Sequence, residues 1–202
     1  MLVTGIKSKP VYAPLQADIR GRYHLMLGLG VGGDPLLRVI AEMQSVAPRA
    51  LEQTRVLYVP ETGTAQTIAQ FKAAIADVRA YEGAPALLQE FKDLLGRSLM
   101  GTRLYVAGPE SFIGLAMKIA LEFNLNKDEI RAEECGTLAR RVYCVHCRAT
   151  TEQVRTNIVT CVGCARWLLV RDHYSRRLAA FQGVNIDAED PGTAPKPEVL
   201  FP

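Results

Sequence analysis

Short apolar runs alternate with longer amphipathic stretches through the first two thirds of the chain. Residues 23–27, 55–59 and 103–107 are mostly aliphatic or aromatic, and a glycine or a proline directly follows each run. Runs of this length and composition are typical of buried β-strands. We therefore predict a strand at each of these three places.

Apolar residues at helical spacing follow these runs. After the first run, Asp34 and Pro35 have the residue types of a helix start, with Asp34 as N-cap and Pro35 in the first helical position. The predicted helical faces are Leu37, Ile40, Met43 and Val46; Ile68, Phe71, Ile75 and Val78; Leu87, Leu88, Phe91, Leu94 and Leu95; and Phe112, Ala116, Ile119 and Phe123. Strands that alternate with helices predict an α/β fold, in which helices flank both faces of a mostly parallel sheet.

The size of the chain suits one good hydrophobic core and a small appendage. It has 202 residues, of which 49% are hydrophobic and 22% charged. No apolar run approaches the roughly eighteen residues that span a bilayer, and no secretory signal peptide is recognisable, so we expect a cytoplasmic protein without a membrane segment. We expect an α/β domain at residues 1–133, a small β-rich metal ribbon at 134–184, and an extended tail at 185–202 whose apolar tip docks on a partner.

Two Cys-x-x-Cys pairs are the strongest local signal. Cys144 and Cys147 form the first pair, Cys161 and Cys164 form the second, and thirteen residues separate the pairs. This spacing is typical of a four-thiolate metal site in which two short loops meet across a hairpin. The alternative, two chance pairs of buried free thiols, is less favoured, and disulfides fit a reducing compartment poorly. The fifth thiol, Cys135, is expected to be a small buried residue rather than a ligand.

The ligand set alone does not separate zinc from iron. We favour zinc, because a closed tetrahedral thiolate site suits it without any redox role, but a rubredoxin-type iron site has the same four ligands. Iron knuckles often carry glycine or another small residue directly after the second cysteine. Arg148 and Ala165 occupy those positions here, so one knuckle departs from that pattern.

Two glycine-rich turns are candidate nucleotide-binding elements. In open α/β sheets, ligands lie at the carboxyl ends of the strands, where such turns lead into helix N-termini. The residues concerned are Gly28, Gly30, Gly32 and Gly33 in the first turn, and Gly108 and Pro109 in the second. Glu52 and Glu61 are both poorly placed to bind a ribose. Glycines that serve only a tight turn and close helix–strand packing are an equal alternative.

Positive charge is concentrated near the cysteine pairs. Between Arg140 and Arg177 there are eight arginines, no lysine, and only Glu152 and Asp172 as acids. A basic metal ribbon is compatible with a nucleic acid or with an acidic protein surface. Val154, Ile158, Val159, Leu168, Leu169 and Val170 are interspersed among the arginines, as expected of strands with one buried face. Nucleic acid is therefore the least favoured partner.

The two glycine turns resemble those of the ferredoxin reductase family. Residues 28–37 resemble its first nucleotide-binding turn, roughly G-G-x-G-x-T-P, and residues 104–112 resemble its later Y-V-C-G-P-x-x-F pattern. The family's threonine, which helps to hold pyrophosphate, is Asp34 here, and a carboxylate there repels phosphate. The family's cysteine beside the nicotinamide is Ala107 here. The resemblance thus implies a reductase-like domain with a degenerate nucleotide pocket and no hydride transfer.

The whole chain is similar to the A subunit family of bacterial dimethylamine monooxygenase, DmmA. Residues 134–147 carry most of this similarity, together with the order of a degenerate reductase-like domain, a four-cysteine ribbon and a short tail. The resemblance implies a heteromeric NADPH- and O2-dependent enzyme that converts dimethylamine to methylamine and formaldehyde. It further implies a partner reductase subunit with flavin and an iron–sulfur cluster, and a catalytic partner subunit with haem and the substrate site.

No residue of the chain itself stands out as catalytic. His24, His146 and His173 are scattered, and haem-ligation and ferredoxin-type cluster motifs are not recognisable. We therefore predict a non-catalytic subunit with a structural or a regulatory role. In the regulatory case, a surviving nucleotide pocket senses NADPH without turning it over. A rubredoxin-like electron carrier is the first alternative, and a nucleic-acid-binding zinc ribbon is the second.

Overall fold

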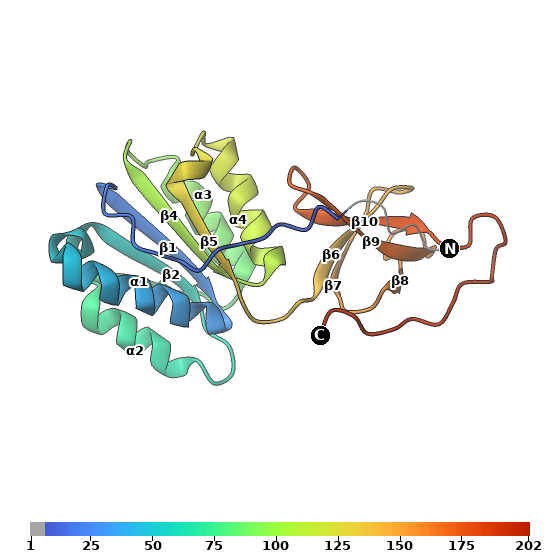
Figure 1. Cartoon of the computed structure of the whole chain (residues 1–202), viewed down its shortest axis with the longest axis horizontal. Coiled ribbons are helices and arrows are strands. Elements are labelled where there is room, and N and C mark those ends of the chain that lie inside the picture. The colour runs from blue at the N-terminus through green and yellow to red at the C-terminus, as the bar shows by residue number, and fades with distance from the viewer. Residues whose placement is uncertain (1–6) are drawn as a thin grey trace. The chain divides into compact units, whose positions relative to one another are not determined.

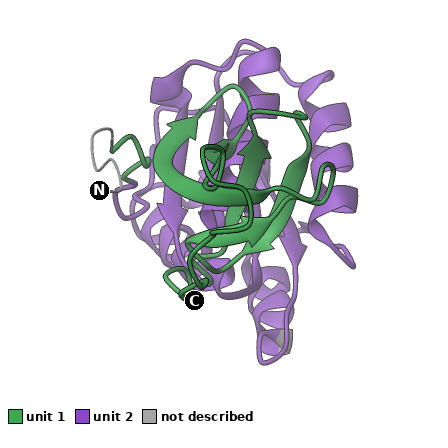
Figure 2. Ribbon diagram, turned by 90° about the vertical axis from the view of Figure 1, so that its right-hand side faces the viewer, with its two compact units in different colours: residues 1–11, 137–202 green, residues 12–136 purple. Residues whose placement is uncertain are grey.

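The computed structural model describes residues 7–202, which form two compact units (Figure 1, Figure 2). Residues 12–136 form one unit, here called the α/β unit. Residues 7–11 and 137–202 form the other, here called the ribbon unit. The ribbon unit therefore contains residues from both ends of the described chain.

The α/β unit is built on a parallel sheet, which confirms the predicted fold class. Its strands are β1 (Tyr23–Leu29), β2 (Thr54–Val59), β3 (Asp77–Ala80), β4 (Thr102–Gly108) and β5 (Ile130–Glu134). Their order across the sheet is β3-β2-β1-β4-β5, and each neighbouring pair is parallel. In the central register, Met26 of β1 lies between Val56 of β2 and Tyr105 of β4.

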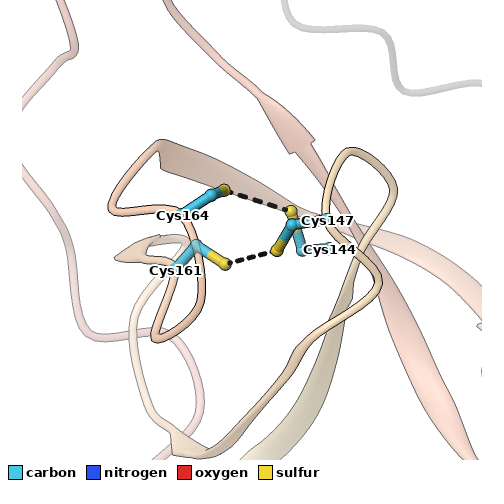
Figure 3. Close-up of side chains that lie close together, drawn as sticks. All are labelled: Cys144, Cys147, Cys161 and Cys164. Carbon is cyan, nitrogen blue, oxygen red and sulfur yellow. Dashed lines mark hydrogen bonds between the residues drawn. The ribbon is translucent and has the colours of Figure 1, made fainter.

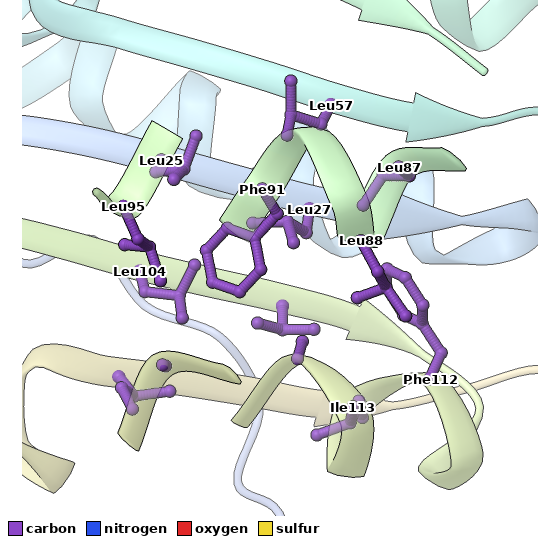
Figure 4. Packing of buried hydrophobic residues seen from close by; sticks show 14 of the residues in the cluster. Leu25, Leu27, Leu57, Leu87, Leu88, Phe91, Leu95, Leu104, Phe112 and Ile113 are labelled. Atoms are coloured by element: carbon purple, nitrogen blue, oxygen red, sulfur yellow. The ribbon is translucent and has the colours of Figure 1, made fainter. Parts of the chain in front are cut away.

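Helices cover both faces of this sheet because its strands alternate two apolar sets of side chains. The helices are α1 (Gly33–Val46), α2 (Ala65–Ala74), α3 (Ala84–Leu95) and α4 (Glu110–Glu122), with 3-10 turns at Gly30–Gly32, Pro48–Gln53 and Lys127–Glu129. Side chains of α1 and α2 pack with Met26, Val56 and Tyr105 on one face. Side chains of α3 and α4 pack with Leu27 and Leu104 on the other face (Figure 4).

Three details of the predicted helices are wrong. Helix α2 ends at Ala74 and Val78 belongs to β3, because Ile75 is already extended and Arg55 of β2 pairs with Asp77. Helix α1 begins at Gly33, so Asp34 lies in its first turn and Gly32 is the N-cap, because a 3-10 turn leads directly into the helix. The buried face of α1 is also shifted: Leu36, Val39, Ile40 and Met43 are buried, whereas Val46 is 63% exposed.

The ribbon unit contains a small mixed sheet. Its strands are β6 (Arg140–Cys144), β7 (Thr150–Val154), β8 (Ile158–Thr160), β9 (Trp167–Ser175) and β10 (Ala180–Asn185), in the order β7-β6-β10-β9-β8. The β6–β10 pair is parallel and the other neighbours are antiparallel. Ser8 extends the unit from the other end of the chain, because its backbone N–H donates to the Asp172 carbonyl at 2.9 Å.

The end of the C-terminal tail contacts the ribbon unit itself through Phe201, whereas Val199 and Leu200 of the same apolar tip are exposed. Phe201 is 9% exposed and packs in the small core of this unit. The guanidinium of Arg140 lies between two rings, 3.8 Å from the Phe201 centroid and 4.0 Å from the Phe181 centroid. The Pro202 carbonyl also accepts the Leu138 N–H at 2.7 Å. Stacking on two aromatic rings offsets the free-energy cost of burying the Arg140 guanidinium.

Over residues 7–202, every helix is too short or too polar to cross a membrane.

Candidate metal centre

Four cysteine side chains converge in the ribbon unit (Figure 3). The Sγ atoms of Cys144, Cys147, Cys161 and Cys164 all lie within 4.8 Å of one another. Cys144 and Cys164 are separated by 3.8 Å between sulfurs, and Cys147 and Cys161 by 3.5 Å. The four residues singled out from their spacing thus meet at one place.

The sulfur positions fit a tetrahedral ion. Metal–sulfur bonds of about 2.3 Å at tetrahedral angles place sulfurs about 3.8 Å apart, close to the two separations given above. An all-thiolate donor set suits zinc and iron, and it disfavours magnesium and calcium, which take oxygen ligands. In such a site the four cysteines would be the ligands and would close the coordination sphere.

The two Cys-x-x-Cys loops share one backbone pattern. In the first loop, Cys144 N–H donates to the Ala149 carbonyl and Arg148 N–H donates to the Cys144 carbonyl, both at 2.9 Å. In the second, Cys161 N–H donates to Arg166 at 2.9 Å and Ala165 N–H donates to Cys161 at 3.0 Å. The same pair of bonds, at the same offsets from the first cysteine, therefore shapes both loops.

A left-handed residue follows the second cysteine of each pair. Arg148 has φ 66° and Ala165 has φ 56°, a region that glycine occupies most easily. The sequence suggested that one loop departs from the usual knuckle, because Arg148 is not a small residue. The structure gives both loops the same turn in spite of their side chains. The sequence signal that was missed is the position directly after each Cys-x-x-Cys pair. In both loops this position adopts the left-handed conformation although neither residue is glycine.

Backbone N–H groups approach the outer sulfurs and affect their acidity. The Arg166 N–H is the largest cause that lowers the pKa of Cys164, to about 6. The Ala149 N–H acts in the same direction on Cys147, but burial and hydrogen bonds with the other thiols together raise the pKa of Cys147 to about 12. Binding an ion would release the protons of these thiols.

The first and second cysteines of each pair differ in exposure. Cys144 and Cys161 are buried in the small core beside Val142 and Leu168, whereas Cys147 and Cys164 are partly exposed. Close approach of the loops requires Gly163, because a Cβ there would come within 2.6 Å of the Ala149 Cβ. The cluster is therefore anchored on its inner side and reaches the surface of the ribbon unit on its outer side.

Cys135 lies outside the cluster, in the α/β unit. Its N–H donates to the Gly108 carbonyl at 2.9 Å, and burial, with Glu133 and Asp34 nearby, raises its pKa to about 11. A thiol held in its protonated form is a poor nucleophile and a poor ligand.

Packing accounts for the glycines of the predicted nucleotide pocket. A Cβ on Gly32 would overlap the Ala107 carbonyl of β4, and a Cβ on Gly33 would overlap Thr67. At Gly30, which has φ 55°, a Cβ would overlap the Glu61 carboxylate. Gly28 lies against Leu36 and Tyr58, and Gly108, with φ 153°, lies against Phe112 and Leu29. Pro109 is the N-cap of α4.

The surroundings of these turns are acidic. The Glu61 carboxylate lies against Gly30, and Asp34 stands in the first turn of α1. Negative charge at these positions opposes the attraction between a helix N-terminus and a phosphate. A cavity of about 540 Å³ lies at the other end of the sheet, where Tyr23, Arg55 and Thr102 begin their strands. Glu52 lines that cavity, far along β2 from the glycine turns.

The three histidines lie in three separate settings. His24 is 2% exposed beside Tyr105, and burial lowers its pKa. His146 receives a contact from the Arg166 guanidinium, with 3.0 Å between Nδ1 and Nη1, and His173 contacts Gln182 at 3.2 Å. Of these contacts, the one between His146 and Arg166 joins the two cysteine loops.

Two family models match the chain in succession. The N-terminal domain of the dimethylamine monooxygenase subunit DmmA-like family matches residues 4–130, and the C-terminal domain of the same family matches residues 141–184. The heme-dependent oxidative N-demethylase delta subunit of Ectopseudomonas mendocina (strain ymp) is 36% identical over 92 residues, which are 46% of this chain. The match spans about half of that relative, 53% of its length.

Solved structures with a related arrangement are more distant. An intact type IV self-sufficient cytochrome P450 monooxygenase is 15% identical, with a TM-score of 0.46 over 67% of this chain and 18% of its own. The ferredoxin reductase of carbazole 1,9a-dioxygenase is 16% identical, with a TM-score of 0.44 over 61% of this chain and 34% of its own. The two family models, by contrast, together cover both units. The chain belongs to the dimethylamine monooxygenase subunit DmmA-like family.

Proposed function

We propose that this chain is a non-catalytic subunit of a heteromeric N-demethylating oxygenase. The observation that carries the proposal is the family match across both units, together with a relative named as the delta subunit of a heme-dependent oxidative N-demethylase. The reaction assigned to the whole complex consumes dimethylamine, O2, NADPH and a proton. It yields methylamine, formaldehyde, water and NADP+.

The partners of this chain in the proposed complex carry the redox chemistry. A reductase subunit would hold flavin and an iron–sulfur cluster and would oxidise NADPH, and a further subunit would hold haem and bind dimethylamine. The arrangement of the α/β unit supports this division of labour. Asp34 and Glu61 make the predicted nucleotide pocket acidic, and Ala107 stands where a reductase would have its cysteine. A cytoplasmic location is part of this proposal, since paired cysteines with metal-ligand spacing are typical of reducing compartments.

In this proposal Cys144, Cys147, Cys161 and Cys164 bind one zinc ion that stabilises the ribbon unit. A closed four-thiolate site stabilises a small domain without taking part in chemistry. The tetrahedral fit and the burial of Cys144 and Cys161 in the core of the ribbon unit support a structural role.

Reconstitution with and without this chain tests the proposal. The subunits encoded beside it are co-expressed, purified, and assayed for formaldehyde release from dimethylamine with NADPH. We expect the chain to co-purify in fixed stoichiometry, with zinc, and we expect a complex prepared without it to lose its integrity or most of its turnover. A chain that never joins the complex, or a complex that is equally stable and active without it, overturns the proposal.

The nucleotide pocket has its own test in isothermal titration calorimetry. We expect the unmodified chain to bind NADPH weakly or not at all, and Asp34→Thr to gain affinity because a repulsive carboxylate is removed. Tight binding by the unmodified chain would contradict the degenerate pocket and favour an NADPH-sensing, regulatory subunit.

An electron carrier is the second candidate, favoured by the exposure of the outer cysteines. Cys147 and Cys164 are partly exposed, and an iron ion bound there would lie near the surface, within reach of a partner cofactor. Metal analysis and an absorption spectrum separate the candidates. One zinc per chain and a colourless protein support the structural subunit, whereas one iron with thiolate charge-transfer bands supports the electron carrier.

The nucleic-acid alternative is weaker than the charge count suggested. Arg140 is stacked between two phenylalanines and paired with Asp172, and Arg141 is paired with Glu152. Two of the eight arginines thus stabilise the ribbon unit itself and are not available to bind phosphates.

A further inference from the structure

The outer ends of the two cysteine loops form one continuous surface, here called the knuckle face. It consists of Val145, His146, Arg148, Val162, Arg166 and Trp167, all of which are exposed. The loops are held side by side by the cysteine cluster and by the contact between Arg166 and His146. The Val145 N–H donates to the Gly183 carbonyl at 3.1 Å, which anchors the first loop on β10. The face is therefore fixed in shape.

Three large apolar side chains of the knuckle face are exposed. Val162 is 71% exposed, Val145 46% and Trp167 39%. A single exposed valine is ordinary on a protein surface, but three large apolar side chains within two adjoining loops are characteristic of an interaction site. Tryptophan in particular is enriched at the energetic centres of protein interfaces.

The two cysteine loops carry arginines and no acidic residue of their own. Residues 144–149 and 161–167 contain Arg148 and Arg166 and no carboxylate. Within the described residues, neither arginine makes an ion pair, whereas the acids Glu152 and Asp172 are paired with Arg141 and Arg140 on the sheet. The complementary surface therefore combines carboxylates with apolar side chains.

From these two properties we infer that the knuckle face docks on an acidic, partly apolar surface of a partner subunit in the oxygenase complex. This inference rests on the proposed function, because it takes its partner from the same complex. A protein is favoured over a nucleic acid since the face exposes two valines and a tryptophan, and a phosphate backbone offers the valines nothing to contact. The cysteine cluster then has a second consequence, because it presents the docking residues in a fixed arrangement.

Matched charge reversals test the electrostatic part. Arg148→Glu with Arg166→Glu changes the knuckle face, and Arg176→Glu with Arg177→Glu makes the same change at the exposed β9–β10 hairpin. That hairpin is about eight strand residues away along β9, or roughly 26 Å. We expect the knuckle pair to weaken binding to the purified partner subunits about tenfold or more, and the hairpin pair to change it less than about twofold.

Matched valine replacements test the apolar part. Val162→Glu places a charge at the most exposed valine of the face, and Val199→Glu makes the same change at a valine that is 67% exposed in the tail. We expect Val162→Glu to weaken binding about tenfold or more, and Val199→Glu to leave it unchanged. All variants are first required to retain the metal content of the unmodified chain, so that lost folding is not mistaken for lost docking.

Trp167 provides a direct readout because it is the only tryptophan of the chain. The chain is labelled with 5-fluorotryptophan and titrated with unlabelled partner subunits. We expect the fluorine resonance to shift and its solvent exposure to fall on binding. If the chain joins the complex but the resonance and the knuckle variants behave as in the free, unmodified protein, the docking surface is wrong while the proposed function stands.

If the unmodified chain does not bind those subunits at all, the proposed function fails first. Light scattering of the chain alone and anisotropy with labelled duplex DNA complete the test. A concentration-dependent dimer broken by the knuckle variants would assign the face to a second copy of this chain. Binding to DNA that these variants abolish, and that falls steeply with salt, would assign it to nucleic acid. Either result overturns the inference.

Discussion

The α/β unit buries long aliphatic and aromatic side chains on both faces of its sheet, whereas two cysteines stand among the few buried residues of the ribbon unit. On one face of the parallel sheet, Phe91 and Leu104 are fully buried, and on the other Phe71 and Tyr105 are. In the ribbon unit the buried cluster is smaller and includes Cys144 and Cys161. Hydrophobic burial scales with size, so the larger unit can stabilise itself.

The ribbon unit has a small core, and contacts between segments far apart in the sequence stabilise it. The cysteine cluster ties two loops, the Arg140 stack ties the C-terminal tail to β6 and β10, and Ser8 ties the other end of the chain to β9. The difference teaches that identical losses of side-chain volume have different consequences in the two units. In the α/β unit a loss is spread over a large core, and in the ribbon unit it removes one of a few links.

Removal of a cysteine ligand should produce the largest difference in stability between the two units. We expect Cys144→Ser or Cys161→Ser to release the metal and unfold the ribbon unit, since structural zinc contributes about 10–16 kcal/mol of apparent binding free energy to small domains. Metal analysis and Trp167 fluorescence report the ribbon unit, and helical circular dichroism reports the α/β unit, which contains α1 to α4.

Cys135→Ser is the matched control for this prediction, because Cys135 lies outside the cluster. It should keep both the metal and the tryptophan signal. A ligand variant that retains its metal, or that loses helical signal together with the tryptophan signal, would break the distinction between the units.

Removal of the tail anchor should destabilise the ribbon unit next most strongly. Phe201→Ala deletes a buried ring and one face of the Arg140 stack, and we expect a loss of about 3 kcal/mol in the unfolding free energy of that unit. Urea unfolding followed by Trp167 fluorescence measures it. Leu200→Ala is the control, since Leu200 is 53% exposed and should cost about 0.5 kcal/mol or less. Equally small effects of both variants would show that the tail does not stabilise the unit.

A test inside the α/β unit asks whether its glycine turn serves packing. Gly32→Ala forces a Cβ into the rigid Ala107 carbonyl, and we expect it to cost about 2–3 kcal/mol in unfolding monitored by circular dichroism. Gly96→Ala is the control, because its nearest contact would be an ordinary 3.5 Å. If Gly32→Ala left stability unchanged, packing would not explain this glycine, and a ligand at the turn would become the better explanation.

The sequence predicted those parts of the fold that are written in local patterns. β1, β2 and β4 are apolar runs, and Cys-x-x-Cys spacing alone brought the four thiols to one place. β3 and β5 were missed because they are short edge strands in which charged residues such as Asp77 and Arg131 alternate with apolar ones. Such a pattern is too brief to distinguish a strand from a helix.

Contacts between distant segments could not be predicted in this way. Arg140 and Phe201 are far apart in the chain, and nothing in either local sequence announces their stacking. From the sequence, Arg140 was therefore counted as surface charge and the tail as an extended arm, although Arg140 and Phe201 stack on each other. The metal-site residues could therefore be predicted from the sequence more readily than the contacts that stabilise the ribbon unit around them.

The smallest predicted effect concerns the strained turns that shape the cluster. Ala165 has φ 56°, where a Cβ costs roughly 1 kcal/mol relative to glycine, so Ala165→Gly should stabilise the ribbon unit by about 0.5–1 kcal/mol. Ala149 lies in the other loop at a position without positive φ. Ala149→Gly should therefore destabilise the ribbon unit, because it raises the conformational entropy of the unfolded chain and removes a contact with the second loop. Unfolding of the metal-loaded protein, followed by Trp167 fluorescence, measures both variants. Opposite signs would establish that the second loop holds its metal-site turn against the preference of its own side chain, whereas equal signs would show that the left-handed turn carries no strain.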